Sequence, residues 1–126
     1  MPYLVDTDVL IDVAKGKEGA AEFLDSLDEP WSLSVITAME LAVGAKDESD
    51  VRRIDEMADA FAMVPLTAAV GATAYGLVKQ FTKSHGLRVF DALIAATALE
   101  TERILVTRNE KHFRMIPALK LRVPKY

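Results

Sequence analysis

Three aspartates follow the first apolar run of the chain, where negative charge needs a physical reason to lie so close to a core. The run YLV, residues 3–5, predicts a short buried strand, and Asp6 follows it directly, with Asp8 and Asp12 a few residues on. Ligands of open parallel sheets bind outside the carboxyl ends of the strands, which makes Asp6 a candidate ligand-binding residue. A divalent cation needs several oxygen ligands, so Asp6 predicts partners elsewhere in the chain.

Structural roles explain the other two aspartates of this segment. Asp8 can cap a helix that begins near Val9 by accepting hydrogen bonds from its free backbone N–H groups. Asp12 can lie on the solvent-facing side of the same helix. We therefore expect Asp8 to act mainly as an N-cap, and otherwise only to support metal-bound waters.

Two further acids stand alone among apolar residues. Glu40 lies one helical turn after an expected strand at residues 31–36, and with Thr37 it also forms the capping-box pattern of a helix start. Asp91 opens an expected helix at residues 90–102, where a helix N-terminal acid is itself stabilising. Both acids thus have a structural explanation beside a functional one.

A polar turn follows the last clear apolar strand, ILVT, in the position that Asp6 occupies after YLV. Thr107 and Asn109 supply its oxygen atoms. If the two strands are neighbours, Asp6, Glu40, Asp91 and this turn converge on one pocket, whose clustered negative charge needs a cation. Mg²⁺ or Mn²⁺ fits such oxygen ligands and is commonly completed by substrate phosphates. The metal would activate water for attack on a phosphodiester, with one carboxylate orienting that water.

The order of the expected elements predicts the fold class. Strands alternate with helices, and parallel neighbours require such long crossover connections, so we expect an α/β fold with a parallel sheet covered on both faces. Further helices are expected at residues 20–27, from Thr37 onward, at 51–62 and at 70–81, with a possible short strand at 63–66.

Composition restricts the remaining possibilities. A length of 126 residues suits one domain, which we expect to span residues 1–126. Cysteine is absent, which excludes thiolate zinc sites, thiol nucleophiles and disulfides and fits a cytoplasmic protein. The sequence has no apolar run long enough to span a membrane and no signal-peptide pattern, so we expect a soluble protein with no membrane partner.

Charge is unevenly distributed along the chain. The formal net charge is −4, yet residues 103–126 hold seven basic residues against one acid, Glu110. A uniformly basic nucleic-acid coat is therefore excluded, whereas a local phosphate-binding patch is not. Alternatively, these basic residues belong to an ordinary solvent-exposed surface that binds no phosphate. As candidate substrate-binding residues we select six, which are Thr107, Arg108, Lys111, His112, Arg114 and, from the segment before Asp91, Arg88.

Four segments together resemble one known family. LVDTDVLIDV, SVITAMELAVGA, HGLRVFDALIAATALE and ILVTRNEKHFRMIPALKL are similar, in order and spacing, to motifs of PIN-domain ribonucleases, in particular the VapC-like toxins of VapBC toxin-antitoxin modules. The resemblance implies a three-layer α/β/α sandwich with a central, mainly parallel sheet. It implies a Mg²⁺- or Mn²⁺-dependent endoribonuclease that inhibits translation and growth, with acids matching Asp6, Glu40 and Asp91. It also implies a VapB-like antitoxin partner and a homodimer.

The chain departs from this family at one position of the site. Many members carry a fourth acid in the segment that corresponds to TRNEKHF, where this chain has Asn109, Glu110 and His112. Asn109 can supply a neutral oxygen or hold a metal-bound water, and His112 can contact phosphate or be structural. We favour Asn109 as the fourth catalytic residue.

Two other interpretations compete with this one. The opening LVDTDVLID also matches a haloacid-dehalogenase-type phosphatase, in which Asp6 would be a nucleophile and Asp8 an acid and base. That chemistry also requires a later pair of adjacent acids, but Asp91 is followed by Ala92. Alternatively, the fold binds RNA or a protein without catalysis, and the acids only cap helices. An RNA cleavage assay with and without metal separates the three.

Overall fold

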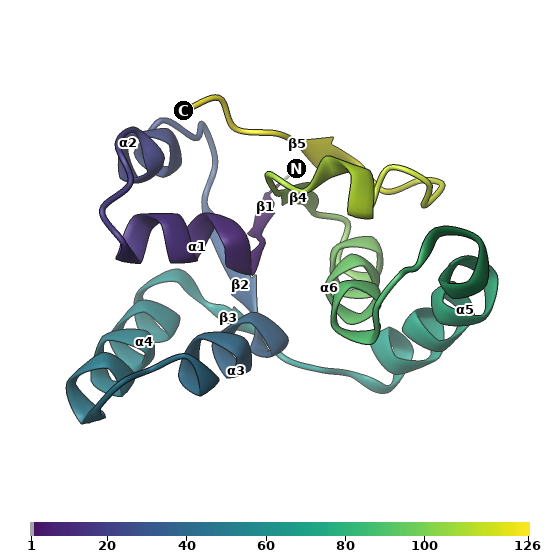
Figure 1. Ribbon diagram of the computed structural model, residues 1–126, viewed down its shortest axis with the longest axis horizontal. Coiled ribbons are helices and arrows are strands. Elements are labelled where there is room, and N and C mark those ends of the chain that lie inside the picture. The colour runs from purple at the N-terminus through teal and green to yellow at the C-terminus, as the bar shows by residue number, and fades with distance from the viewer. Residues whose placement is uncertain (1) are drawn as a thin grey trace.

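The computed structural model describes residues 2–126, and within them strands alternate with helices (Figure 1). In chain order the elements are β1 (Tyr3–Val5), α1 (Thr7–Ala14), α2 (Ala20–Asp25), β2 (Trp31–Ser34), α3 (Val35–Val43), α4 (Glu48–Phe61), β3 (Met63–Val64), α5 (Ala68–His85), α6 (Val89–Glu100), β4 (Ile104–Val106), the 3₁₀ turn η1 (Glu110–His112) and β5 (Leu121–Arg122).

The sheet has the strand order β3-β2-β1-β4-β5, and every pair of neighbours is parallel. The first strand of the chain is thus the central one. Val5 at the end of β1 pairs with Val106 at the end of β4, so the residues that follow these strands leave the sheet at the same edge. This confirms the expected parallel sheet and the neighbouring strand ends on which the predicted site depends.

Helices cover both faces of the sheet, which confirms the expected three layers (Figure 1). Leu4 and Leu105 pack into a core beneath α5 and α6, whereas Val5 and Val106 pack into a second core beneath α1 and α2. This alternation is the two-residue period of a strand buried on both faces. Helix α3 follows β2 directly and packs against α1 and α4 on one side and α6 on the other.

One local expectation was wrong, and one strand was not expected. Helix α3 begins at Val35 rather than at Thr37, because the hydroxyl of Ser34 caps it by accepting hydrogen bonds from the backbone N–H groups of Ile36 and Thr37. Thr37 is instead buried inside the helix, so the capping-box explanation for Glu40 does not hold. The last strand, β5, was not expected at all, since two residues carry too short a pattern to distinguish a strand from a loop.

Gly19 permits a close contact between α2 and the last described residue, Tyr126. Its φ is +87°, and a Cβ atom placed there would lie 2.7 Å from the Cβ of Tyr126. We expect Gly19→Ala to lower the free energy of unfolding by about 1–3 kcal/mol through backbone strain and overpacking. Gly76→Ala is the control, because Gly76 lies within α5 with no atom within 4 Å of a new Cβ. It should stabilise by up to about 1 kcal/mol. Urea denaturation measures both, and equal effects would contradict the role of this contact.

Candidate active site

Asp6 lies at the end of β1 with both carboxylate oxygens engaged. Its Oδ1 accepts a hydrogen bond of 2.8 Å from the backbone N–H of Thr7, and its Oδ2 accepts one of 2.8 Å from the hydroxyl of Thr107. The side chain is buried, with 4% of the residue exposed. Burial and the negative charge of Asp8 raise the pKa of Asp6 to about 7, although both hydrogen bonds oppose this. A nearby cation would remove the cost of ionising this acid.

Asp8 does not have the role that the sequence predicted for it. Asp6 is the N-cap of α1, which begins at Thr7, so the expectation that Asp8 caps a helix starting near Val9 was wrong. Asp8 lies in the first turn, where its Oδ1 accepts from the backbone N–H of Val9 and its Oδ2 accepts at 2.9 Å from that of Arg108. Burial raises the pKa of Asp8, partly offset by these hydrogen bonds. Asp8 therefore ties α1 to the turn after β4.

Asp12 was expected on the solvent-facing side of α1, but it does not lie there. Its Oδ2 accepts hydrogen bonds from the guanidinium of Arg108 at 2.9 Å and from the hydroxyl of Tyr126 at 2.7 Å. Burial works against ionisation, but these two donors outweigh it and lower the pKa of Asp12. The guanidinium carbon of Arg108 also lies 5.2 Å from the centre of the Tyr126 ring. Because Tyr126 is 114 residues from Asp12, no local pattern in the sequence predicts this contact.

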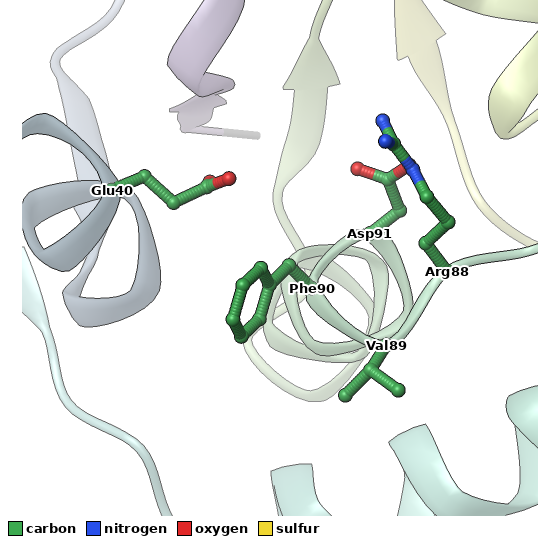
Figure 2. Close-up of a pocket in the computed structure, with 5 residues that line it drawn as sticks. All are labelled: Glu40, Arg88, Val89, Phe90 and Asp91. Atoms are coloured by element: carbon green, nitrogen blue, oxygen red, sulfur yellow. The ribbon is translucent and has the colours of Figure 1, made fainter. Parts of the chain in front are cut away.

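Glu40 and Asp91 face each other across a pocket of about 280 Å³ that is also lined by Arg88, Val89 and Phe90. Figure 2 shows the Glu40 carboxylate reaching from α3 toward the Asp91 carboxylate on α6. The two acids therefore come from helices that follow different strands, as the sequence predicted.

Hydrogen bonding holds Glu40 in the pocket. The hydroxyl of Thr7 donates to Glu40 Oε1 at 2.7 Å, and the Thr7 hydroxyl oxygen lies 3.0 Å from that of Thr37. Thr7 thus contacts two carboxylates, donating its backbone N–H to that of Asp6 and its hydroxyl to that of Glu40. Sequence reasoning missed Thr7, and its position between two aspartates was the only available signal.

Asp91 is half-buried and has two basic neighbours. Its Oδ2 lies 3.8 Å from Arg88 Nε and 3.7 Å from His112 Nδ1. Burial raises the pKa of Asp91, and the charges of Arg88 and His112 partly offset that rise. Both distances exceed an ordinary hydrogen bond, so neither partner saturates the carboxylate.

The turn after β4 brings the remaining candidates to the same edge. Thr107 is buried against Asp6, and its oxygen accepts a hydrogen bond of 3.1 Å from the backbone N–H of Asn109. The side chain of Asn109 is exposed, whereas that of His112 is partly covered and faces Asp91. Geometry therefore brings His112 nearer to the acids than sequence reasoning expected.

The basic candidates divide into three groups. Arg108 is engaged by Asp12 and Tyr126, whereas Lys111 and Arg114 are exposed on and just after η1. Arg88 lies at the rim of the pocket beside Asp91. Neutralising Arg108 would therefore disturb the α1 contact as well as remove a positive charge.

The acids offer the donor type of a magnesium or manganese site, although they do not enclose an ion as they stand. Among residues 2–126, no three acidic or histidine side chains lie close enough together to hold one. Each carboxylate oxygen of Asp6 accepts one hydrogen bond and keeps a further lone pair. Glu40 and Asp91 keep oxygens directed at the pocket. The charge and the hard oxygen donors fit a divalent cation accompanied by waters.

Comparison with known proteins identifies the fold family. The family model for the PIN domain matches residues 3–118, which include every acid described above. The chain belongs to the PIN-domain family. This match, which covers the whole sheet up to β4 and the turn after it, argues against the dehalogenase-type phosphatase.

Relatives of this PIN domain carry informative names. It is 33% identical over 120 residues to "Ribonuclease VapC10" of Mycobacterium tuberculosis, covering 93% of this chain and 90% of the relative. "Ribonuclease VapC19" of the same species is 31% identical over 120 residues, covering 92% and 95%. The expected likeness to VapC proteins is thus confirmed.

Solved structures agree with these relatives. A chain of VapBC2 from Rickettsia felis, bound to a DNA fragment from its promoter, matches with a TM-score of 0.83 and 25% identity, covering 99% of this chain and 100% of that one. A toxin-antitoxin complex from Klebsiella pneumoniae matches with a TM-score of 0.79 and 30% identity, covering 98% and 96%. In the described part of this PIN domain, no helix is long and apolar enough to cross a membrane.

Proposed function

We propose that this PIN domain is a divalent-metal-dependent endoribonuclease and the toxin of a toxin-antitoxin pair. The observation that carries the proposal is the arrangement of Asp6, Glu40 and Asp91 from three separate elements around one edge of the sheet, with Asp6 buried and its pKa raised. The names of the relatives, which are ribonucleases and VapBC complexes, support the substrate and the partner.

Asp6, Glu40 and Asp91 would hold Mg²⁺ or Mn²⁺. When bound, the metal lowers the pKa of a coordinated water and stabilises the charge that develops on the attacked phosphate. Thr107 and Thr7 are positioning residues, since their hydroxyls orient the carboxylates of Asp6 and Glu40. Asn109 remains our proposed fourth catalytic residue, and the contact of His112 with Asp91 makes His112 its rival.

Several further features belong to the same proposal. The chain acts as one nuclease unit, pairs with a small VapB-like antitoxin and forms a homodimer in the cytoplasm. RNA cleavage by the free toxin stops translation and growth. The match to the toxin-antitoxin complex from Klebsiella pneumoniae supports the antitoxin partner.

A cleavage assay tests the proposal directly. Purified protein, single-stranded RNA and either Mg²⁺, Mn²⁺ or EDTA are combined, and the products are separated by length. We expect internal cuts with metal and none with EDTA. RNA that is bound but never cut under any of these conditions would favour the non-catalytic alternative.

Lys111 and Arg114 are proposed to bring the RNA backbone to the acids, which repel phosphate by themselves. We expect Lys111→Gln combined with Arg114→Gln to weaken RNA binding similarly for different sequences. The slope of log affinity against log salt should fall by about 0.7 per lost phosphate contact. Lys79→Gln combined with Lys83→Gln is the control, since these lysines lie on α5 rather than on or beside η1. A titration at two salt concentrations decides, and an unchanged slope would remove this surface from the RNA path.

A further inference from the structure

Phe90 is exposed at the acidic pocket, where an aromatic ring has no structural task. The residue is 57% exposed, and its neighbour Val89 is 59% exposed. Within residues 2–126, neither hydrophobic core includes Phe90, and the buried face of α6 begins only at Ala92. Exposed apolar side chains that gather at a pocket indicate a binding surface.

The ring lies beside the groups that the reaction requires. Phe90 lines the same pocket as Glu40 and Asp91, and in Figure 2 its ring lies beneath the gap between their carboxylates. Arg88, two residues earlier, is at the same rim with its guanidinium mostly exposed. A phosphodiester held at the acids therefore has a flat apolar surface on one side and a cation on the other.

We propose that Phe90 is a platform on which one base of a single-stranded RNA stacks next to the cleaved phosphate. This inference rests on the proposed ribonuclease function and adds a substrate requirement, which is an unpaired base at this position. Single-stranded RNA is commonly held by aromatic rings, because every base has a flat face and stacking tolerates any sequence. A base within a duplex is already stacked and paired, so Phe90 favours unpaired RNA.

A second copy of the chain is the other occupant that such a surface suggests. The pocket argues for the base, because Phe90 shares it with the charged groups of Arg88, Glu40 and Asp91. The buried centres of protein interfaces are depleted of charged residues. A pocket of about 280 Å³ also suits a single base better than a longer segment.

Binding without cleavage tests the platform. Affinities are measured in EDTA for a short oligoadenylate and for the same oligomer without its central bases. The proteins are the wild type, Phe90→Leu, which keeps an apolar side chain but no ring, and Phe90→Trp, which keeps a ring. Tyr75→Leu is the matched control, because Tyr75 is an exposed aromatic residue on α5 outside the pocket.

We expect Phe90→Leu to bind oligoadenylate about 5-fold or more weakly than the wild type, while Phe90→Trp and Tyr75→Leu bind normally. The oligomer without central bases should bind the wild type and Phe90→Leu equally. Equal affinity of both proteins for oligoadenylate would overturn the platform. An equal loss of affinity by Phe90→Leu for both oligomers would overturn it too. A smaller molar mass of Phe90→Leu than of the wild type in light scattering would also overturn it, because it would assign Phe90 to a contact between copies of the chain. If the wild type bound no RNA in EDTA and also left it uncut with Mg²⁺ or Mn²⁺, the ribonuclease proposal would fall together with the platform.

Discussion

Asp6→Asn is expected to reduce metal-dependent RNA cleavage about 100-fold or more while the protein stays folded. Loss of a group that only supports a metal ligand costs about 10–100-fold, so loss of a ligand should reach at least the upper end. Asparagine keeps the shape of Asp6 and is an equally good N-cap for α1. The measurement is the initial rate of RNA cleavage with Mn²⁺, together with circular dichroism.

Asp47→Asn is the matched control for this change. Asp47 caps α4 through a hydrogen bond of 2.9 Å from the backbone N–H of Asp50, and it lies outside the pocket. It should leave cleavage unchanged. Full activity of Asp6→Asn would exclude Asp6 from the site.

Asp6→Asn should also change how the free energy of unfolding depends on pH. Because the pKa of Asp6 is raised to about 7, the folded protein binds this proton more tightly than the unfolded chain does. Its contribution to stability is therefore complete at low pH and is lost as the pH rises toward 7. In metal-free protein, Asp6→Asn should match the wild type near pH 4 and exceed it at pH 8, by at most about 4 kcal/mol. Lower stability of the variant at pH 8 would mean that the negative charge of Asp6 stabilises the fold.

Glu40→Gln is expected to reduce cleavage by a similar factor and to weaken binding of Mn²⁺. The glutamine oxygen can still accept the hydrogen bond from the Thr7 hydroxyl, so the free energy of unfolding should change by less than about 0.5 kcal/mol. Isothermal titration with Mn²⁺ gives the metal affinity independently of cleavage.

Glu100→Gln serves as the comparison for Glu40→Gln. Glu100 lies at the end of α6 and also accepts a threonine hydroxyl, that of Thr73, at 2.9 Å, but it is exposed and outside the pocket. Its replacement should alter neither metal affinity nor cleavage. Normal Mn²⁺ affinity of Glu40→Gln would leave Glu40 as a partner of Thr7 only.

The central part of the site could be predicted from sequence because it follows from sheet geometry. Residues that follow parallel neighbouring strands must leave the sheet at the same edge, which is why Asp6 and Thr107 were expected close together. The Thr107 hydroxyl lies 2.8 Å from Asp6 Oδ2. Glu40 and Asp91 were recognisable because each is an acid in an apolar segment of a helix.

The support around the site could not be predicted in the same way. Thr7 binds Glu40 and Tyr126 binds Asp12 across large separations in sequence, and neither residue type signals its partner. The start of α3 was misplaced because Ser34 and Thr37 are both good caps, and only the end of β2 decides between them. Asp8 was assigned as the cap of α1 because two aspartates, both good caps, stand two residues apart. The structure shows that Asp6 is the cap.

The central position of β1 has a consequence for the time at which the enzyme becomes active. The ribosome makes β1 first, yet one edge of this strand stays unpaired until β4 has been made. Asp6 and Thr107 are 101 residues apart, which corresponds to roughly 5–20 s of synthesis. Until then, Asp6 lacks the hydroxyl that orients it. A growing chain of the proposed toxin therefore lacks the complete site until β4 and the turn after it have been made.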